Sequence, residues 1–290
     1  MFNKIIGDNN MKKITLIIAA VAMVFTACQK NEMAGTKTIS LTATRAQMTT
    51  TKTAFSGNDV VWVAGDAIVA IDENGKIATL TTDKGGAKAN FKGEAPEDFG
   101  TIQYAFYPAN KFVGYSEGKI DFTLANASYV KEKVLAANPS FAKIGGASVQ
   151  FKNVCGMMVV PVKIVEPVDP EEEIQINSMA ITDGVNDLWG TCTLNCESGE
   201  IESIANGGKT ITDPFVNTDD RDYYFIVPAG SFAAGVSLEV AGNYCRMGAR
   251  KGKMSTTKGN TVAKSSIVVM PGLKFSFNND QWCYVLEPAN

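Results

Sequence analysis

The sequence contains no histidine among its 290 residues. Histidine is the commonest general base in enzymes and the commonest protein ligand of zinc, so its absence weighs against most hydrolytic and zinc-dependent chemistry. No serine has a histidine base, and no glycine-rich phosphate loop opens a helix. The sequence therefore predicts a protein that is not an enzyme and that needs no cofactor.

An excess of positive charge is also missing. The chain has 27 Lys and Arg against 30 Asp and Glu, which gives a formal net charge of −3. Proteins that bind nucleic acid or anionic membrane surfaces usually carry a basic excess or a basic patch. The charge balance therefore indicates no nucleic-acid partner.

Long hydrophobic runs are limited to one segment near the start of the chain. Lys12 and Lys13 precede an apolar run from Ile14 to Phe25, and small residues follow it. A charged start, a short apolar core and small residues at a cut site are the parts of a secretory signal peptide. The run is shorter than the roughly 20 residues that cross a bilayer. The alternatives are an ordinary signal peptide, in which the cysteine after the run, Cys28, is present by chance, or a buried helix.

The end of this segment, Phe25-Thr26-Ala27-Cys28, resembles a bacterial lipobox, in which the cysteine is acylated and becomes the first residue of the mature chain. We therefore predict a signal peptide over residues 1–27, lipidation at Cys28 and a polar, lipidated tether over residues 28–36. The residues before Met11 suit no signal, so translation is expected to start at Met11. Contact with a membrane is expected through the lipid only.

Five cysteines remain beside Cys28, and an odd number cannot all pair within the chain. Cys192 and Cys196 are spaced as in a CxxxC motif, but the residues around them have the pattern of a strand. At about 3.3 Å per residue the two lie ~13 Å apart, too far for a disulfide. Small buried core residues are favoured over metal ligands. The sequence leaves open the pairing of Cys155, Cys192, Cys196, Cys245 and Cys283.

Short strands separated by turn signals fill the rest of the chain. Ile39, Leu41 and Ala43 alternate with polar residues, which is the period of a strand. Asn74-Gly75 is a strong hairpin signal. Residues 128–140 are the least regular and are expected to form a crossing loop, with room for a helical turn. The pattern predicts an all-β protein, as a β-sandwich or a barrel.

Three carboxylates gather in Asn217-Thr218-Asp219-Asp220-Arg221-Asp222. A calcium loop or a paired-carboxylate hydrolase site would need such groups. The spacing matches no EF-hand, however, and Arg221 can neutralise its neighbours. A solvated turn before the strand at Tyr223 is favoured, and no metal site is predicted.

Several phrases, in this order, resemble the fimbrillin family of cell-surface lipoproteins, which includes subunits of major and minor fimbriae. They span residues 51–55, 60–68, 107–110, 151–156, 224–230 and 270–272, within a match from about 36 to 277. In the second phrase, Trp62 suits a buried position, Gly65 a tight turn and Asp66 an acceptor of backbone N–H bonds. The resemblance implies two tandem transthyretin-like β-sandwich domains, which we place at residues 37–147 and 148–290.

The resemblance also implies a function. We expect a non-enzymatic, lipid-anchored, surface-exposed protein of the outer membrane, part of a fimbrium if assembled, that acts as a structural or adhesive subunit. Its partners are then other fimbrial subunits or further copies of itself, joined by β-strand exchange. The alternative is a monomeric surface lipoprotein that binds glycan or a host protein. The resemblance does not distinguish between shaft, tip and anchor roles.

Fimbrillin-type subunits lose an N-terminal strand by cleavage after an arginine, and the resemblance makes the Arg45–Ala46 bond the candidate. Arg45 lies in a polar, Thr-rich segment, where we expect a protease to reach it. Loss of the strand before it would expose an apolar groove and unpaired backbone groups. The alternating residues 273–277 are the candidate donor strand. The alternative is that residues 39–43 form a permanent strand and that Arg45 is an ordinary surface residue.

Overall fold

The computed structural model describes residues 35–50, 60–129, 131–145, 149–165, 174–214, 219–244, 249–257, 259, 261–278 and 283–288. The chain divides into two units, Met1–Thr36 and Lys37–Asn290, and nearly all described residues belong to the second. The predicted signal peptide and Cys28 lie outside the described residues. Nearly all of the regular secondary structure in the described part is strand, which confirms the predicted all-β class.

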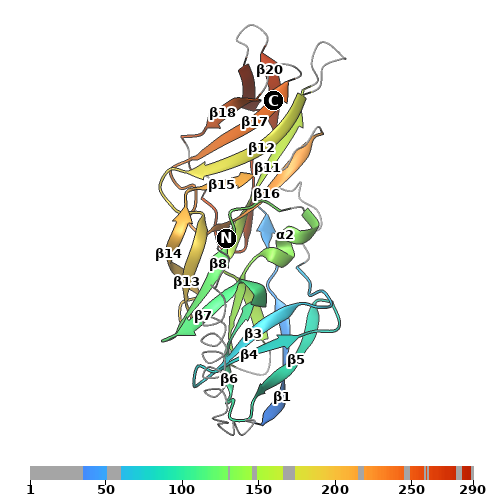
Figure 1. Cartoon of the computed structure of the whole chain (residues 1–290), viewed down its shortest axis with the longest axis vertical. Coiled ribbons are helices and arrows are strands. Elements are labelled where there is room, and N and C mark those ends of the chain that lie inside the picture. The colour runs from blue at the N-terminus through green and yellow to red at the C-terminus, as the bar shows by residue number, and fades with distance from the viewer. Residues whose placement is uncertain are drawn as a thin grey trace, which may run out of the picture. The chain divides into compact units, whose positions relative to one another are not determined.

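A sheet that closes on itself occupies the first part of the second unit (Figure 1). Its strands follow the order β1 (Thr36–Arg45), β10 (Val149–Asn153), β9 (Ser140–Lys143), β6 (Ile102–Tyr107), β3 (Ala67–Asp72), β4 (Ile77–Thr81) and β5 (Lys88–Pro96). The predicted Asn74-Gly75 turn joins β3 to β4, and Gly75 takes a φ of +79° that glycine adopts without strain.

The closed sheet surrounds an aromatic core. Trp62 is 1% exposed, as predicted, and its ring meets Phe91, Tyr107 and Phe151 edge to face at 4.8, 5.2 and 5.3 Å between ring centres. Such edge-to-face pairs favour a single arrangement of the rings.

Two further sheets face one core in the second part. One follows the order β2 (Thr49–Thr50), β19 (Ser266–Val269), β11 (Cys155–Ile164), β20 (Leu273–Asn278) and β21 (Cys283–Pro288), and β16 (Arg221–Pro228) pairs with β11. The other follows β15 (Thr210–Asp213), β12 (Ile174–Asp183), β17 (Val236–Tyr244) and β18 (Ala249–Ser255). Their inner faces share one cluster of buried side chains, which includes Val160, Phe225 and Phe275.

A fourth sheet draws strands from both predicted domains. It follows the order β14 (Glu200–Gly208), β13 (Trp189–Asn195), β8 (Lys119–Leu124) and β7 (Phe112–Ser116). We call it the shared sheet, because β8 belongs to residues 37–147 and β13 to residues 148–290, and the two pair from Gly190↔Leu124 to Asn195↔Lys119. The division into two tandem domains stays a prediction.

One local arrangement of strands occurs in both parts. In the first, β1 lies between its parallel partner β10 and β5; in the second, β11 lies between its parallel partner β20 and β16.

The segment expected to be a crossing loop contains the helix α2 (Lys131–Ala137), and the short 3₁₀ helix η1 (Ala109–Lys111) precedes β7. Val134, at the centre of α2, is fully buried. Within the described ranges, no helix combines the length and apolar character that a membrane crossing requires.

Candidate functional site

β1 completes the closed sheet by filling the position between β5 and β10. It pairs in parallel with β10 at Ala43↔Val149, Thr44↔Gln150 and Arg45↔Phe151. On its other side, the hydroxyl of Thr38 donates to Glu94 at 2.8 Å and that of Thr42 to Asn90 at 3.3 Å. The alternating pattern of residues 39–43 therefore forms the predicted strand, and that strand belongs to the closed sheet.

Arg45, the last residue of β1, is buried at 4% exposure. Its guanidinium carbon lies 4.5 Å from the centre of the Tyr107 ring and 5.2 Å from that of Trp62. Nη2 donates to the backbone oxygens of Leu135 at 3.0 Å and Asn138 at 3.3 Å. These oxygens lie at the C-terminal end of α2, where a helix leaves its last carbonyls unpaired. Arg45 therefore joins β1, the aromatic core and α2.

The electrostatics of this site follow from burial. Desolvation lowers the pKa of Arg45 from its ordinary value, and the neighbouring Tyr107 and Asp66 oppose that shift. Burial also raises the pKa of Tyr107. The Tyr107 hydroxyl donates to Asp66 Oδ1 at 3.0 Å, and Asp66 Oδ2 accepts the backbone N–H of Val63 at 2.8 Å, the role predicted for this aspartate. The buried cation thus has a carboxylate and two aromatic faces near it.

The expectation that a protease reaches Arg45 is wrong for this folded state. A polar, Thr-rich sequence indicated an exposed segment, but the arginine side chain turns into the aromatic core. The residue is also not the ordinary surface arginine of the alternative. Cleavage after Arg45 stays a prediction. Residues 45, 62, 107 and 138 are far apart in the sequence, and their spacing does not indicate that they are in contact.

The residues after Arg45 have their own attachments. The backbone N–H of Ala46 donates to Phe151 O at 2.7 Å, and Ala46 borders a cavity of about 520 Å³. The Gln47 side chain exchanges two hydrogen bonds with the backbone of Val60, and Met48 is buried. Thr49 N–H donates to Ser265 O at 2.8 Å. The chain beyond the candidate bond is therefore held independently of β1.

The candidate donor, residues 273–277, forms a strand as predicted, but this strand is built into its own sheet. β20 lies between β11 and β21, and Leu273 and Phe275 are buried in the second core at 1% and 0% exposure. Its role as a donor stays a proposal.

The three cysteines that the structure describes fully, Cys155, Cys192 and Cys196, are free thiols and fully buried. This confirms the prediction that Cys192 and Cys196 are small core residues. Burial raises the pKa of Cys155, and it raises the pKa of both Cys192 and Cys196 to about 12. The thiols therefore stay protonated and unreactive at neutral pH. Cys245 lies outside the described residues, and Cys283 begins β21.

The acidic segment is solvated where the structure describes it. Asp219, Asp220 and Asp222 are exposed, and Asp220 Oδ1 accepts the backbone N–H of Ile164 at 2.9 Å. Arg221 lies 3.5 Å from Asp213. Among the described residues, no group of acidic or cysteine side chains is arranged to hold a metal ion.

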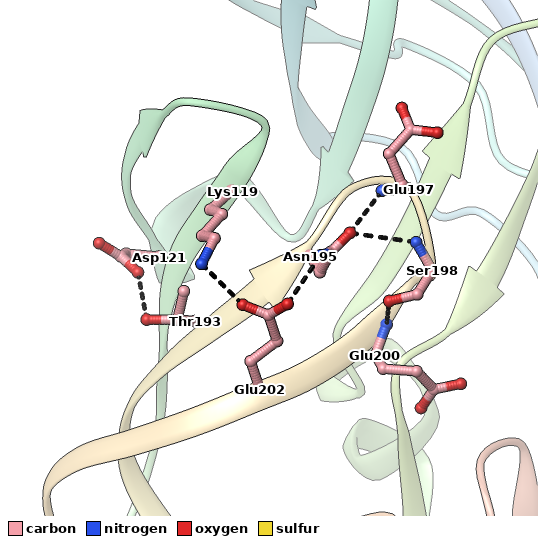
Figure 2. Close-up of polar contacts among 8 residues, drawn as sticks. All are labelled: Lys119, Asp121, Thr193, Asn195, Glu197, Ser198, Glu200 and Glu202. Atoms are coloured by element: carbon pink, nitrogen blue, oxygen red, sulfur yellow. Dashed lines mark hydrogen bonds and ion pairs between the residues drawn. The ribbon is translucent and has the colours of Figure 1, made fainter.

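Polar contacts fix the β13–β14 hairpin of the shared sheet (Figure 2). Asn195 Oδ1 accepts the backbone N–H groups of Glu197 and Ser198 at 2.8 and 3.1 Å, which forms the turn. Glu202 pairs with Lys119 of β8 at 2.8 Å and accepts Asn195 Nδ2 at 2.7 Å.

The same turn reaches the closed sheet. Glu197 accepts the Tyr104 hydroxyl at 2.9 Å and pairs with Lys143 of β9. No sequence pattern indicates this cluster, because it depends on strand pairing between distant segments. It connects the two parts of the chain.

Comparison with known proteins supports the fold. No family model and no curated protein matches the sequence. A solved structure from Bacteroides uniformis has a TM-score of 0.51 at 15% identity, over 87% of this chain and 97% of its own. Another, from Bacteroides ovatus, has a TM-score of 0.50 at 14% identity, over 88% of this chain and 97% of its own. Each is described as a "putative cell adhesion protein". At this identity the similarity shows the fold alone.

Proposed function

We propose that this chain is a non-enzymatic, lipid-anchored cell-surface subunit of the fimbrillin type, which assembles by exchanging β1 for a strand of a neighbouring subunit. The observation that carries the proposal is the position of β1, the first described strand, which closes a sheet and ends at Arg45, directly before the candidate bond. The fold, shared with two structures described in terms of cell adhesion, agrees with it.

Loss of β1 would open the sheet between β5 and β10. The backbone groups of β10 that now pair with β1 would become unpaired, and the position that β1 leaves would expose the core around the rings of Trp62 and Phe151. An open edge beside an apolar groove is a template for β-augmentation by another chain.

β1 is also less deeply packed than β11. Ile39 and Leu41 are only half-buried, and Ala43 is a small side chain. β11, in contrast, is buried at each of its first six residues. Because stabilisation scales with buried apolar area, β1 is the more replaceable of the two strands.

The edges of the shared sheet are poorly suited to the same kind of pairing. Its edge strands are β7 and β14, and the pairs that they form, β7–β8 and β13–β14, contain register shifts typical of bulges. Bulges at edges discourage pairing with other chains. This leaves the β1 position as the better candidate for exchange.

A disulfide that locks β1 to β10 tests the proposal. Thr44 and Gln150 are direct partners across the pair, so T44C/Q150C places two cysteines on adjacent strands. We expect wild-type cells to carry assembled subunits that run as ladders, whereas oxidised T44C/Q150C stays monomeric and assembles after reduction. The single variant T44C is the matched control and should assemble like wild type.

The N-terminus of surface-recovered protein is the second readout. Ala46 as first residue, with filaments visible by electron microscopy only in cells that make the protein, supports exchange of β1. An acylated Cys28 on every surface molecule, with no assembly in any variant, would support the monomeric lipoprotein instead. Truncation after Gly272 is a poor test, because it removes the buried Leu273 and Phe275 and so the core itself.

A further inference from the structure

We propose that residues 126–129 and 131–138, which we call the strap, guard the Arg45–Ala46 bond, so that cleavage there requires release of the strap from the folded protein. The inference rests on the proposed function, in which this bond is cut during maturation, and it adds how the cut is regulated.

The start of the strap is attached to the second part of the chain. Asn126 Oδ1 accepts the backbone N–H of Thr212 at 2.9 Å, and the Ser128 hydroxyl donates to Asp213. The backbone N–H of Tyr129 donates to Tyr224 O at 2.9 Å, in an isolated bridge to β16. These contacts set the path of the strap before α2 begins.

The middle of the strap is fixed by burial. Val134 is fully buried in the cluster that also contains Phe106 and Tyr224. α2 is too short to be stable by itself, so its conformation depends on this packing. Weakening the contact of Val134 should therefore release α2 while the sheets remain folded.

The end of the strap closes over Arg45. Leu135 O and Asn138 O accept the two hydrogen bonds that Arg45 Nη2 donates, and Asn138 is itself fully buried. A cation at the C-terminal end of a helix also interacts favourably with the helix dipole. The strap and the arginine side chain thus stabilise each other.

A protease that cuts after arginine must hold that side chain in a pocket of its own, as proteases do with the residue before the cut bond. Here the guanidinium lies between the aromatic rings and α2, and Ala46 N–H is hydrogen-bonded to Phe151 O. Both the side chain and the flanking backbone must leave the fold before the bond is cut.

The strap and Arg45 of β1 each affect the stability of the other. A change that frees the strap should favour exposure of Arg45, and loss of β1 should free the strap, because Leu135 O and Asn138 O then lack their donor. Removal of β1 should therefore raise the rate of amide hydrogen exchange in α2.

Limited digestion by an arginine-specific protease tests the proposal on the purified mature chain. The sequence has four arginines, so the fragment that begins at Ala46 is readily identified by mass spectrometry. We compare V134A with V240A, because both remove a fully buried valine, one from the strap and the other from β17. We expect V134A to speed cleavage after Arg45 by about tenfold or more, while V240A leaves it near the wild-type rate, since cleavage follows the population of the locally open form.

An equal increase in the rate of cleavage after Arg45 in both variants would show that Arg45 becomes exposed only by global unfolding. Fast cleavage in the wild type would show that the strap does not protect the bond. Either result overturns the proposal. If V134A does not fold, S128A, which removes only the bond to Asp213, replaces it, with S237A as its control. The assay needs no assembly. A failure of fimbria formation in cells would therefore overturn the proposed function without altering the digestion result.

Discussion

The indole Nε1 of Trp62 donates a hydrogen bond of 3.0 Å to the backbone oxygen of Ala43. The bond joins the core of the closed sheet directly to β1, whose position the proposed exchange would vacate. The ring that fills the first core therefore also recognises the backbone of β1.

Removal of the Trp62 ring should strongly destabilise the protein. We expect W62A to lower the free energy of unfolding by about 3–5 kcal/mol, because it leaves a large cavity beside Phe91 and Phe151. W62F keeps most of the packing and loses the bond to Ala43, which should cost about 1 kcal/mol beyond the change in volume. Urea denaturation measures both.

V63A is the control for Trp62, since Val63 is its neighbour and is 54% exposed. Its effect should stay within about 0.5 kcal/mol. A loss below about 1 kcal/mol for W62A would contradict the role of the ring in the core.

The ion pair of Glu197 should make stability depend on pH. Hydrogen bonds from Lys143 and Tyr104 lower the pKa of Glu197 below its ordinary value of 4.5. A carboxylate with a lowered folded pKa stabilises the protein above its unfolded pKa, and this contribution is lost as the pH falls through the folded pKa. The difference in urea midpoint between wild type and E197Q should therefore be constant near neutral pH and shrink below about pH 4.5. E97Q, at an exposed position on a turn, is the matched control.

Two buried aspartates, Asp183 and Asp72, should each contribute to the free energy of unfolding through the backbone hydrogen bonds that they accept. Burial opposes the ionisation of Asp183, but hydrogen bonds from Phe232, Val185 and Asn186 outweigh it and lower its pKa. Asp72 is arranged in the same way, with backbone donors from Gly100, Lys76 and Asn74. D183N and D72N should each lose about 1.5–3 kcal/mol of stability at pH 7, because an amide nitrogen cannot accept these bonds.

The aspartate effect should also weaken in acid. Both carboxylates have a lowered folded pKa, so their contribution is present at neutral pH and is lost as the pH falls below the unfolded value. D83N, at an exposed position, is the control. Unchanged stability in D183N would show that the turn does not need the charge.

The buried thiols should resist chemical modification in the native state. Their raised pKa values leave Cys155, Cys192 and Cys196 protonated at pH 8, and their sulfur atoms are inaccessible. We expect an alkylating reagent to label these three residues only after denaturation, as seen by peptide mass spectrometry. Rapid labelling of Cys192 in the folded protein would show that β13 opens readily.

Lipidation at Cys28 has its own test. C28A should abolish incorporation of labelled fatty acid and leave the precursor unprocessed, because the thiol is the group that is acylated. One acyl chain binds a membrane only marginally, so stable anchoring needs more than one. If the variant partitions into detergent like wild type, the predicted lipobox is wrong.

The sequence alone determined the fold class, because alternating residues, turn signals and a buried tryptophan are local features that short-range physics controls. Asn74-Gly75 formed its hairpin, Trp62 its core contacts and Asp66 its backbone bond. The thiols at Cys192 and Cys196 were correctly expected in the core, since strand spacing excluded a disulfide between them.

Only the tertiary structure decided the environment of Arg45. Its neighbours Trp62, Tyr107 and Leu135 come from segments far apart in the chain, and they meet because the sheet containing β1 closes on itself and α2 folds back over its end. A charged residue in a polar segment favours exposure by its solvation energy, and that local preference was overcome by hydrogen bonds and aromatic contacts that no sequence spacing encodes.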